Sequence, residues 1–395
     1  MGSALLSAGR DFSTKGYFST KWTTRPSTAS LRPLPGKITV QSPRTSPSPY
    51  TGKPPTIWIR PSSSALLDDI PATNLLCLRS YNVDSSAVSV SGISSGGAMA
   101  AQYHVAHSRD IMGVGIIAGA MWGAGGGNLA TSTSVMFSPN LISLSLLEWQ
   151  AATAAMLGNI DSTYHMKSDR VYVFDGSLDV IVNPAMGRQI ETFYKHYVRS
   201  TSQIKMVLYN NAQHSMPTRN YGGPCNKLNI PTYLNNCGYD AAYELLNHIY
   251  GGGLRKPDTN TRAGGHLAKF DQSEFFTASP ITYSMDTVGY VYIPTGCADR
   301  QTRCKLHVAF HGCAMGQSAI DDVYVRHGGY NEVAELNNII ILYPQVVAAP
   351  PLNVNGCWDW FGYTGIYYAT NKGFQIEGVR RMIARVIGSG NHLIG

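Results

Sequence analysis

The segment VSVSGISSGG, residues 88–97, decides the fold of this chain of 395 residues. Small and β-branched residues alternate in its first half, which is the pattern of a strand, and the run over 98–107 is typical of a helix. A Gly-x-Ser-x-Gly pentapeptide centred on Ser94 stands between the two. Chance can supply such a pentapeptide in a chain rich in Gly and Ser. Between a strand and a helix, however, it forms the sharp turn that exposes a nucleophilic serine, so we predict that Ser94 is a catalytic nucleophile.

A serine nucleophile needs a general base and a carboxylate that orients this base. In the α/β-hydrolase fold both follow the serine, first the acid and then the histidine, each after a strand of the central sheet. The predicted strand 170–174 runs into DGSLD, which ends at Asp179. The predicted strand 205–209 runs into NNAQH, which ends at His214. We predict that Asp179 and His214 complete a triad with the serine, and Asp175, nearer the strand end, stays open as the alternative acid.

An ester hydrolase also needs two N–H donors for the negatively charged oxygen of its tetrahedral intermediate. One comes from the residue after the nucleophile, here Ser95. A second candidate is the turn HGC, residues 311–313, which follows the predicted strand 305–310 and is a close relative of the His-Gly-Gly oxyanion turn. That strand normally precedes the nucleophile, whereas here it comes far after it. The order predicts a circularly permuted α/β-hydrolase whose usual first half lies at the C-terminus.

Further elements are predicted from hydrophobic patterns along the chain. Apolar, β-branched runs predict strands over residues 114–118, 170–174, 205–209, 288–293, 305–310 and 339–343. Clear helical patterns cover residues 239–250 and 374–387. Strands that alternate with helices predict a mostly parallel central sheet flanked by helices. Residues 251–285 are Gly-rich and polar, and we expect them to form a long connection.

The charge of the chain is unevenly distributed. The formal net charge is +7, yet residues 1–60 hold nine Lys or Arg and one acid, which leaves 22 basic and 23 acidic residues for the rest. Because the body is nearly neutral, the net charge does not imply a basic face for nucleic acid. The Ser/Thr/Pro-rich residues 1–75 are predicted to be a disordered tail, and residues 76–395 a single catalytic domain. No run approaches the roughly 20 apolar residues of a membrane span, so we expect no membrane partner. We also expect no nucleic-acid partner and a monomeric protein.

Six of the seven cysteines fall into three pairs, namely Cys225 with Cys237, Cys297 with Cys304, and Cys313 with Cys357. In each of the first two pairs, a short loop dense in Gly, Pro, Asn or Asp lies between the two cysteines and suits a local disulfide. Six cysteines can nevertheless pair in many ways. Disulfides indicate an oxidising compartment, and we expect an extracellular protein although the tail looks more like a transit peptide than a signal peptide. Zinc spacing is lacking, so we predict no metal and no cofactor.

Four stretches together carry a resemblance to a known family: residues 88–97 (VSVSGISSGG), 306–313 (LHVAFHGC), 340–345 (IILYPQ) and 355–360 (NGCWDW). With them, residues 82 to about 390 resemble the fungal-type extracellular poly(3-hydroxybutyrate) depolymerases, which are single-domain and circularly permuted. The resemblance implies Ser94, Asp179 and His214 as the triad, and the backbone N–H groups of Ser95 and Cys313 as the oxyanion hole. It also implies the three disulfides named above.

A polyester offers alternating ester and methyl groups, so its binding crevice should be apolar with aromatic walls. We predict Trp358 and Trp122 as substrate-binding residues, with Trp360 and Tyr363 as further candidates. The predicted reaction is hydrolysis of poly(3-hydroxybutyrate) or its oligomers through an acyl-enzyme on Ser94. Two alternatives stay open: a feruloyl or acetyl esterase acting on plant polysaccharide, and a catalytically silent hydrolase that serves as a binding protein.

Overall fold

The fold is built around β1 (Val83–Ile93), the strand that leads into Ser94. The structure is a computed structural model that describes residues 75–388, so the predicted tail lies outside the described residues except for its last position. Strand β1 pairs in parallel with β2 (Gly113–Ile117) on one side and with β10 (Cys304–Phe310) on the other. Two strands more than 200 residues apart in the chain therefore meet at the centre of the sheet.

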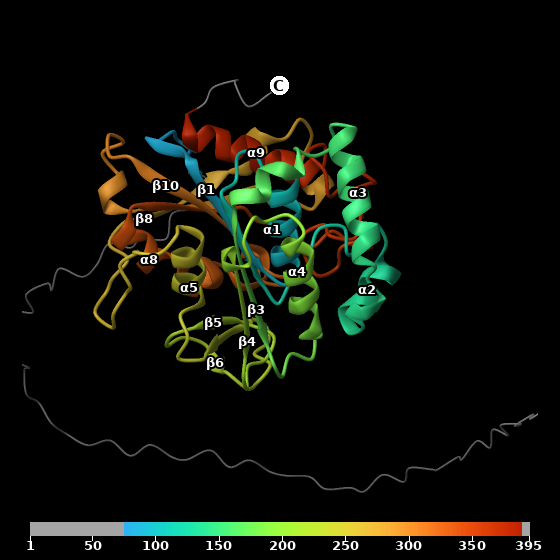
Figure 1. The fold of residues 1–395 in the computed structure, drawn as a ribbon. Coiled ribbons are helices and arrows are strands. Elements are labelled where there is room, and N and C mark those ends of the chain that lie inside the picture. Colours follow the sequence, from blue (N-terminus) through green and yellow to red (C-terminus); the bar gives the residue numbers. More distant parts are fainter. Residues whose placement is uncertain (1–74, 389–395) are drawn as a thin grey trace, which may run out of the picture. The chain divides into compact units, whose positions relative to one another are not determined.

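The central sheet has eight strands in the order β4-β3-β2-β1-β10-β11-β9-β8 (Figure 1). The remaining strands are β3 (Arg170–Gly176), β4 (Ile204–Tyr209), β8 (His266–Asp271), β9 (Val288–Ile293) and β11 (Ile339–Tyr343). Only the pairs that β9 makes with β11 and β8 are antiparallel. A small separate sheet contains β5 (Met216–Thr218), β6 (Gly223–Pro224) and β7 (Leu234–Asn236). The predicted α/β fold with a mostly parallel sheet is thus confirmed.

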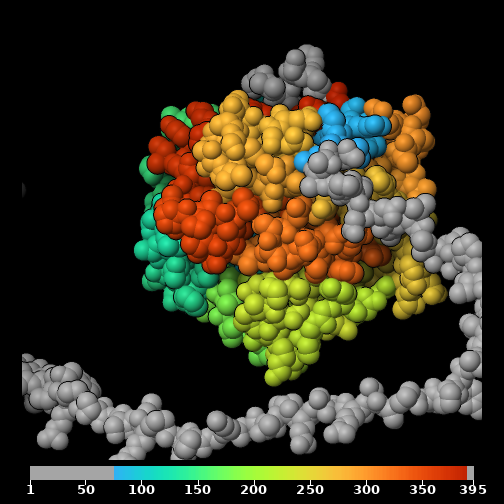
Figure 2. Space-filling view, turned by 180° about the vertical axis from the view of Figure 1, so that it is seen from behind, coloured from blue at the N-terminus to red at the C-terminus, as the bar shows by residue number. Residues whose placement is uncertain are grey.

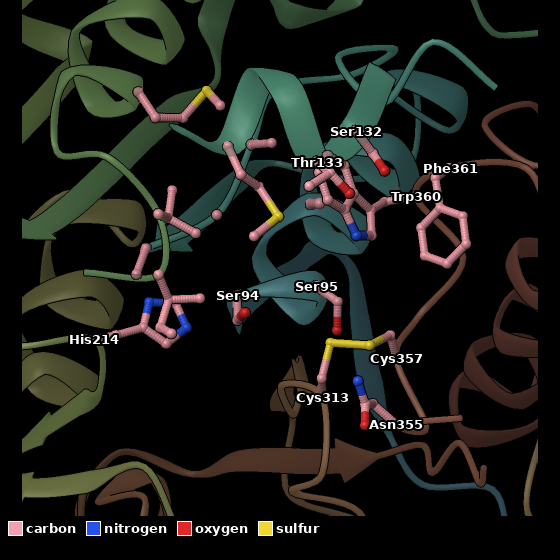
Figure 3. Close-up of a pocket in the computed structure, with 18 of the residues that line it drawn as sticks. Ser94, Ser95, Ser132, Thr133, His214, Cys313, Asn355, Cys357, Trp360 and Phe361 are labelled. Carbon is pink, nitrogen blue, oxygen red and sulfur yellow. A yellow bond between two sulfur atoms is a disulfide. The ribbon is translucent and has the colours of Figure 1, made fainter. Parts of the chain in front are cut away.

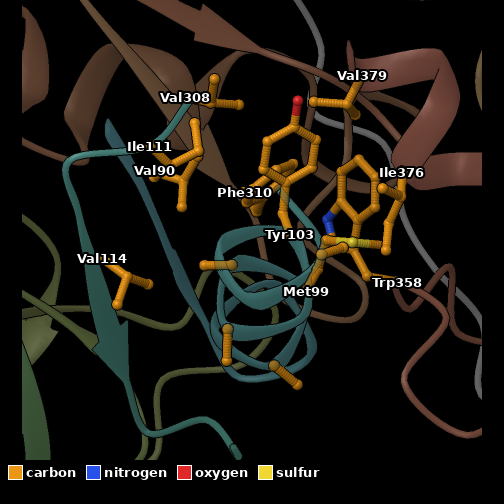
Figure 4. Packing of buried hydrophobic residues seen from close by; sticks show 14 of the residues in the cluster. Val90, Met99, Tyr103, Ile111, Val114, Val308, Phe310, Trp358, Ile376 and Val379 are labelled. Carbon is orange, nitrogen blue, oxygen red and sulfur yellow. The ribbon is translucent and has the colours of Figure 1, made fainter. Parts of the chain in front are cut away.

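Helices cover both faces of the sheet. They are α1 (Ser95–Ala106), α2 (Leu129–Phe137), α3 (Leu144–Met156), α4 (Ala185–Lys195), α5 (Ala241–Ile249), α6 (Gln317–Ile320), α7 (Val323–His327), α8 (Tyr330–Asn337) and α9 (Phe374–Ile387). Short 3-10 helices lie at Pro139–Leu141, Thr163–Ser168, Thr201–Gln203, Gln272–Phe275, Pro280–Tyr283 and Thr295–Cys297. One core contains residues of α1, α4 and α9, and the other contains residues of α5 and α8. Figure 4 shows the first core, in which Met99 and Tyr103 of α1 lie near Ile376 and Val379 of α9.

The predicted elements agree with the structure in most places. The strands over 288–293 and 339–343 and the helix over 374–387 have the predicted bounds, and the other predicted elements differ by a few residues at their ends. The long connection predicted for 251–285 is wrong, because this segment contains β8, an edge strand that pairs with β9. Only Ala268 and Phe270 of β8 are buried, so too few apolar residues mark it in the sequence.

The first and last described segments lie side by side. Tyr81 donates its backbone N–H to the carbonyl of Val386 at 2.8 Å. Arg300 donates its Nε–H to the carbonyl of Ser80 at 2.9 Å. In Figure 2 the first described residues, in blue, lie beside orange segments from the last third of the chain. The described chain therefore begins and ends at the same side of the domain.

The three predicted disulfides are confirmed: Cys225–Cys237, Cys297–Cys304 and Cys313–Cys357. Cys77 is exposed and forms no disulfide within residues 75–388. In the same range, no helix has both the length and the apolar character that a membrane crossing requires. The described residues also contain no group of three or more His, Cys, Asp or Glu placed to hold a metal ion.

Acidification is expected to destabilise this fold. Burial lowers the pKa of His107 and His307 to about 3 and that of His311 to about 4. An unfolded histidine has a pKa of about 6.5, so below that pH the unfolded chain binds protons that the folded chain does not, and the free energy of unfolding falls as pH falls. Burial raises the pKa of Asp175, which acts in the opposite direction. Each of the three histidines contributes a loss of up to about 2 kcal/mol between pH 7 and pH 5, and the buried acids reduce the total.

Urea unfolding followed by circular dichroism at pH 7 and at pH 5 measures this loss. The variant His307→Gln removes one of these three histidines with a lowered pKa, so its loss between the two pH values should be smaller than that of the wild type. Equal free energies of unfolding at both pH values in the wild type would contradict the expectation.

Candidate active site

Ser94 lies in the turn between β1 and α1, in a strained backbone conformation. Its φ is 57° and its ψ is −124°, which a residue with a side chain adopts only when the surrounding structure imposes it. Its N–H donates to the carbonyl of Ile117 at 2.9 Å, and its carbonyl accepts from the N–H of Ala98 at 3.0 Å. The neighbouring strand and the first turn of the helix together hold the serine in this conformation.

The glycines of the pentapeptide are needed because the backbone approaches other chain segments closely. A Cβ atom at Gly92 would lie 2.2 Å from the carbonyl oxygen of Gly96. A Cβ atom at Gly96 would lie 2.4 Å from the carbonyl oxygen of Phe310 and 2.3 Å from that of His311. Only glycine fits at both positions, so the motif places Ser94 next to the turn that follows β10.

Asp179 and His214 form a buried pair. Asp179 lies in the loop after β3, and its Oδ2 is 2.7 Å from Nδ1 of His214, in the loop after β4. Its Oδ1 accepts the backbone N–H groups of Ile181 and Val182, both at 2.8 Å. The carboxylate is thus held in one orientation, and Nε2 of His214 is the ring nitrogen that stays available to the serine.

The alternative acid, Asp175, lies in a different environment. It is fully buried near the end of β3, and among the described residues neither of its carboxylate oxygens accepts a hydrogen bond. Burial, together with the negative charge of Asp179, raises its pKa well above the usual value. The structure brings Asp179, and not Asp175, to the histidine.

Ser94 and His214 line one pocket of about 390 Å³ (Figure 3). Ser95 and Cys313, the two residues expected to supply oxyanion N–H groups, line it as well. The apolar part of its wall comes mainly from Ala118, Ala120, Leu129, Met136, Ile181, Val182, Met186, Met315, Trp360 and Phe361. The pocket therefore joins a nucleophile and a base to walls that suit an apolar substrate.

The turn at residues 311–313 is fixed against Ser94. A Cβ atom at Gly312 would lie 3.3 Å from Cβ of Ser94, so the two segments are in contact. Nε2 of His311 accepts the N–H of Val346 at 3.2 Å, which leaves the ring proton on Nδ1, and this proton is donated to the carbonyl of Gly312 at 2.7 Å. Because C=O and N–H point in opposite directions across a trans peptide, His311 orients the N–H of Cys313 as well.

The two tryptophans predicted to bind substrate, Trp358 and Trp122, do not line the pocket. Trp358 is 0% exposed and packs edge to face on Phe310, with ring centroids 4.9 Å apart, in the core shown in Figure 4. The indole N–H of Trp122 donates to the carbonyl of Ala369 at 2.7 Å in the same core. In the structure both side chains are packed in the core and contribute nothing to the lining of this pocket, so a substrate-binding role for them stays a prediction.

The aromatic residues that line the pocket are instead Trp360, Phe361 and Tyr233, the last of which packs edge to face on the ring of His214. Trp360 was a weaker candidate in the sequence, and Phe361 was missed. The hydroxyl of Tyr363, the other candidate, donates to the carbonyl of Cys357 at 2.7 Å, and the residue does not line the pocket. Ile181 and Val182 were not predicted as lining residues either, although they follow the predicted acid Asp179 by two and three positions.

Comparisons with known proteins give concordant relatives, and no family model matches the chain. It is 36% identical over 321 residues to a poly(3-hydroxybutyrate) depolymerase from Delftia acidovorans, a match that covers 80% of this chain and 62% of that protein. It therefore spans less than two thirds of that relative's length. It is 34% identical over 332 residues to a polyhydroxybutyrate depolymerase from Talaromyces funiculosus, a match that covers 80% of this chain and 92% of that protein.

Two solved structures are similar as well. The crystal structure of the PHB depolymerase from Penicillium funiculosum matches with a TM-score of 0.73 and 32% identity, over 79% of this chain and 99% of that one. A serine-to-alanine variant of a PHB depolymerase, complexed with an R3HB trimer, matches with the same TM-score of 0.73, identity of 32% and coverage of 79% and 99%.

Proposed function

The chain belongs to the poly(3-hydroxybutyrate) depolymerases, a family of carboxylic-ester hydrolases, and on this premise we propose that it hydrolyses ester bonds of 3-hydroxybutyrate polymers or oligomers. One observation carries the proposal. Ser94 and His214 line the same apolar pocket, and Asp179 holds the histidine at 2.7 Å. The match to a depolymerase that binds an R3HB trimer supports a 3-hydroxybutyrate ester as the substrate.

In the proposed reaction, Nε2 of His214 takes the proton of the Ser94 hydroxyl while the serine oxygen attacks the ester carbonyl. The carbon–oxygen bond to the leaving alcohol then breaks, and the histidine returns its proton to that alcohol. A water molecule, deprotonated by the same nitrogen, releases the acyl group from the serine. Asp179 orients the ring and stabilises the positive charge that the ring carries between these steps.

The proposed oxyanion hole contains the backbone N–H groups of Ser95 and Cys313. Ser95 is the first residue of α1, where helix geometry leaves N–H groups without a partner inside the helix. Three features support Cys313: the hydrogen bond from His311 to Gly312, the disulfide to Cys357, and the contact of the turn with Ser94. Donors fixed in this way stabilise the developing negative charge without having to reorganise.

We also propose that the fold is a circularly permuted α/β-hydrolase. The order of the strands in space supports this: β10, which carries the turn at 311–313, lies next to β1, and β3 and β4 follow on the other side. In the usual chain order the element with the oxyanion turn precedes the nucleophile. The adjacency of Tyr81 and Val386 fits a permutation as well, since chain ends that lie together can be joined and reopened elsewhere.

Two further parts of the proposal concern the chain as a whole. Residues 76–395 form the catalytic domain, in which both halves of the sheet contribute to one site. The protein acts outside the cell or in another oxidising compartment, because three disulfides would not persist under cytosolic reducing conditions.

A comparison of two esters tests the function. The wild-type protein should hydrolyse an R3HB trimer with a kcat/KM at least about 100-fold higher than that for a feruloyl ester of arabinose, because the polar sugar of the latter would be desolvated against apolar walls. Released 3-hydroxybutyrate and ferulate are measured by liquid chromatography. Faster release of ferulate would favour the esterase alternative. A chain that neither turns over these esters nor is labelled by a fluorophosphonate probe would be a binding protein.

A further inference from the structure

We propose that Asp359 is a positioning residue whose buried carboxylate folds residues 359–364 into the turn that holds Trp360 and Phe361 against the substrate pocket. The inference rests on the proposed function, because it assigns to this turn the part of the substrate that extends beyond the scissile ester. Asp359 itself does not line the pocket.

Five donors of the turn converge on this one carboxylate. Oδ1 of Asp359 accepts the backbone N–H groups of Phe361 at 3.3 Å, Gly362 at 2.6 Å and Tyr363 at 3.1 Å. Oδ2 accepts the backbone N–H of Thr364 at 2.7 Å and its hydroxyl at 2.6 Å. Every residue that follows the aromatic pair in the turn is thus tied to the same side chain.

The carboxylate and the turn depend on each other energetically. Asp359 is 1% exposed, and burial is the main cause that raises its pKa, while the hydrogen bonds from Thr364, Gly362 and Tyr363 oppose this rise. Burying a carboxylate costs free energy unless donors of this kind bind it. The N–H groups of residues 361–364 likewise need an acceptor, which the carboxylate provides. The backbone of Asp359 is held as well: the side chain of Gln375 accepts its N–H at 2.9 Å, and the side chain of Gln102 donates to its carbonyl at 2.8 Å.

The turn is packed so closely that a shift would move the pocket wall. Trp360 and Phe361 are 8% and 9% exposed, and both line the pocket. A Cβ atom at Gly125 would lie 1.9 Å from the carbonyl oxygen of Trp360, and one at Gly362 would lie 3.1 Å from Cα of Gly127. The turn therefore contacts the glycine segment that leads into α2, the helix that forms another part of the wall.

The catalytic groups do not share this dependence on Asp359. Ser94, Asp179 and His214 lie in loops after β1, β3 and β4. The segment around Asp359 does contact α1, the helix after the nucleophile, but through backbone groups and not through the carboxylate. Oγ of Ser95 accepts the N–H of Trp358 at 3.2 Å, and Gln102 of α1 donates to the carbonyl of Asp359 at 2.8 Å. Loss of the Asp359 contacts should therefore affect how a long substrate is bound and leave the chemistry on a short ester intact.

The test variant is Asp359→Asn, which keeps the shape of the side chain and replaces one oxygen by an NH2 group that cannot accept from Thr364. The KM for the R3HB trimer should rise about tenfold, as expected for the loss of one or two buried hydrogen bonds. By contrast, kcat/KM for p-nitrophenyl acetate should stay within about threefold. Thr364→Val should shift the KM in the same direction by less, and Thr364→Ser, which keeps the hydroxyl, should restore it.

A second measurement reports on the wall directly. The emission spectrum of Trp360 is obtained by subtracting the spectrum of a Trp360→Phe derivative from that of the parent protein. In Asp359→Asn this difference spectrum should shift to longer wavelength. The matched control is Asp299→Asn, because Asp299 also accepts from two backbone N–H groups and one hydroxyl but belongs to a loop that does not line the pocket. It should change neither the emission nor the KM.

Two outcomes would overturn the positioning role: an unchanged Trp360 emission in Asp359→Asn, or an equal loss of activity on the trimer and on p-nitrophenyl acetate. Should Asp359→Asn fail to fold, Thr364→Val and Thr364→Ser decide the same question. A wild-type protein that leaves the trimer intact would refute the proposed function alone, since the emission of Trp360 still decides whether Asp359 positions the wall.

Discussion

Replacing Ser94 by alanine is expected to lower kcat for the R3HB trimer by at least about 10⁴-fold, with little change in KM. The reason is that the hydroxyl oxygen of Ser94 forms the covalent bond to the acyl group, and alanine has no atom that can replace it. The backbone N–H groups of the oxyanion hole and the apolar walls stay in place, so the substrate still binds. Release of 3-hydroxybutyrate under saturating trimer measures the effect.

The matched control for this variant is Ser95→Ala. It removes a hydroxyl one residue away, which accepts the backbone N–H of Trp358 at 3.2 Å, but it keeps the N–H proposed for the oxyanion hole. Its kcat should stay within about tenfold of the wild type, because one neutral hydrogen bond is lost. Equal clearing of a poly(3-hydroxybutyrate) film by Ser94→Ala and the wild type would disprove the role of Ser94.

The position of the candidate site could be predicted because each of its residues lies in a short sequence pattern that can be identified by itself. The pentapeptide around Ser94 needs its glycines for contacts within a few ångströms, and such steric demands leave a short, recognisable pattern. Asp179 and His214 each follow a buried strand, and parallel strands bring their carboxyl ends to one edge of the sheet. The chain order of these three residues was therefore enough to predict that they lie close together.

The helices beside the pocket could not be predicted in the same way. In α2 only Ser132 and Val135 are buried, so the helix has no apolar stripe of helical period. Its start is fixed by a cap, in which the side chain of Asn128 accepts the N–H of Thr131 at 2.8 Å. A single cap residue in a segment rich in Gly, Ser and Thr is too common a feature to identify a helix.

The aromatic wall shows a different limit of sequence reasoning. The motif CWDW places two tryptophans on either side of Asp359, and its composition does not distinguish the buried one from the one at the pocket. The distinction arises from two kinds of contact: Trp358 packs on Phe310, while Asp359 accepts the N–H groups of the turn that follows Trp360, a residue that lines the pocket. The contact between Trp358 and Phe310 joins residues 48 positions apart and leaves no local pattern, and the turn around Asp359 is local but has no residue pattern that identifies it.

The choice between the two aspartates leads to the second large effect, expected for Asp179→Asn. The backbone N–H groups of Ile181 and Val182 bind Oδ1, so the oxygen of an asparagine would stay with them and its NH2 group would face Nδ1 of His214. Nδ1 would then have to accept, and the ring proton would move to Nε2, the atom that must accept the proton of Ser94. We expect kcat for the trimer to fall by about 10³- to 10⁴-fold.

Asp175→Asn is the control for this effect, because it makes the same chemical change near the end of the same strand. Asp175 is fully buried, neither of its oxygens accepts a hydrogen bond among the described residues, and its raised pKa favours the neutral acid, so an amide replaces a group of similar shape and charge. We expect its kcat to stay within about tenfold of the wild type. A larger loss in Asp175→Asn than in Asp179→Asn, with both variants folded, would reverse the assignment of the acid. The hydrogen bond of 2.7 Å from His214 to Asp179 would then have to be attributed to structure instead of catalysis.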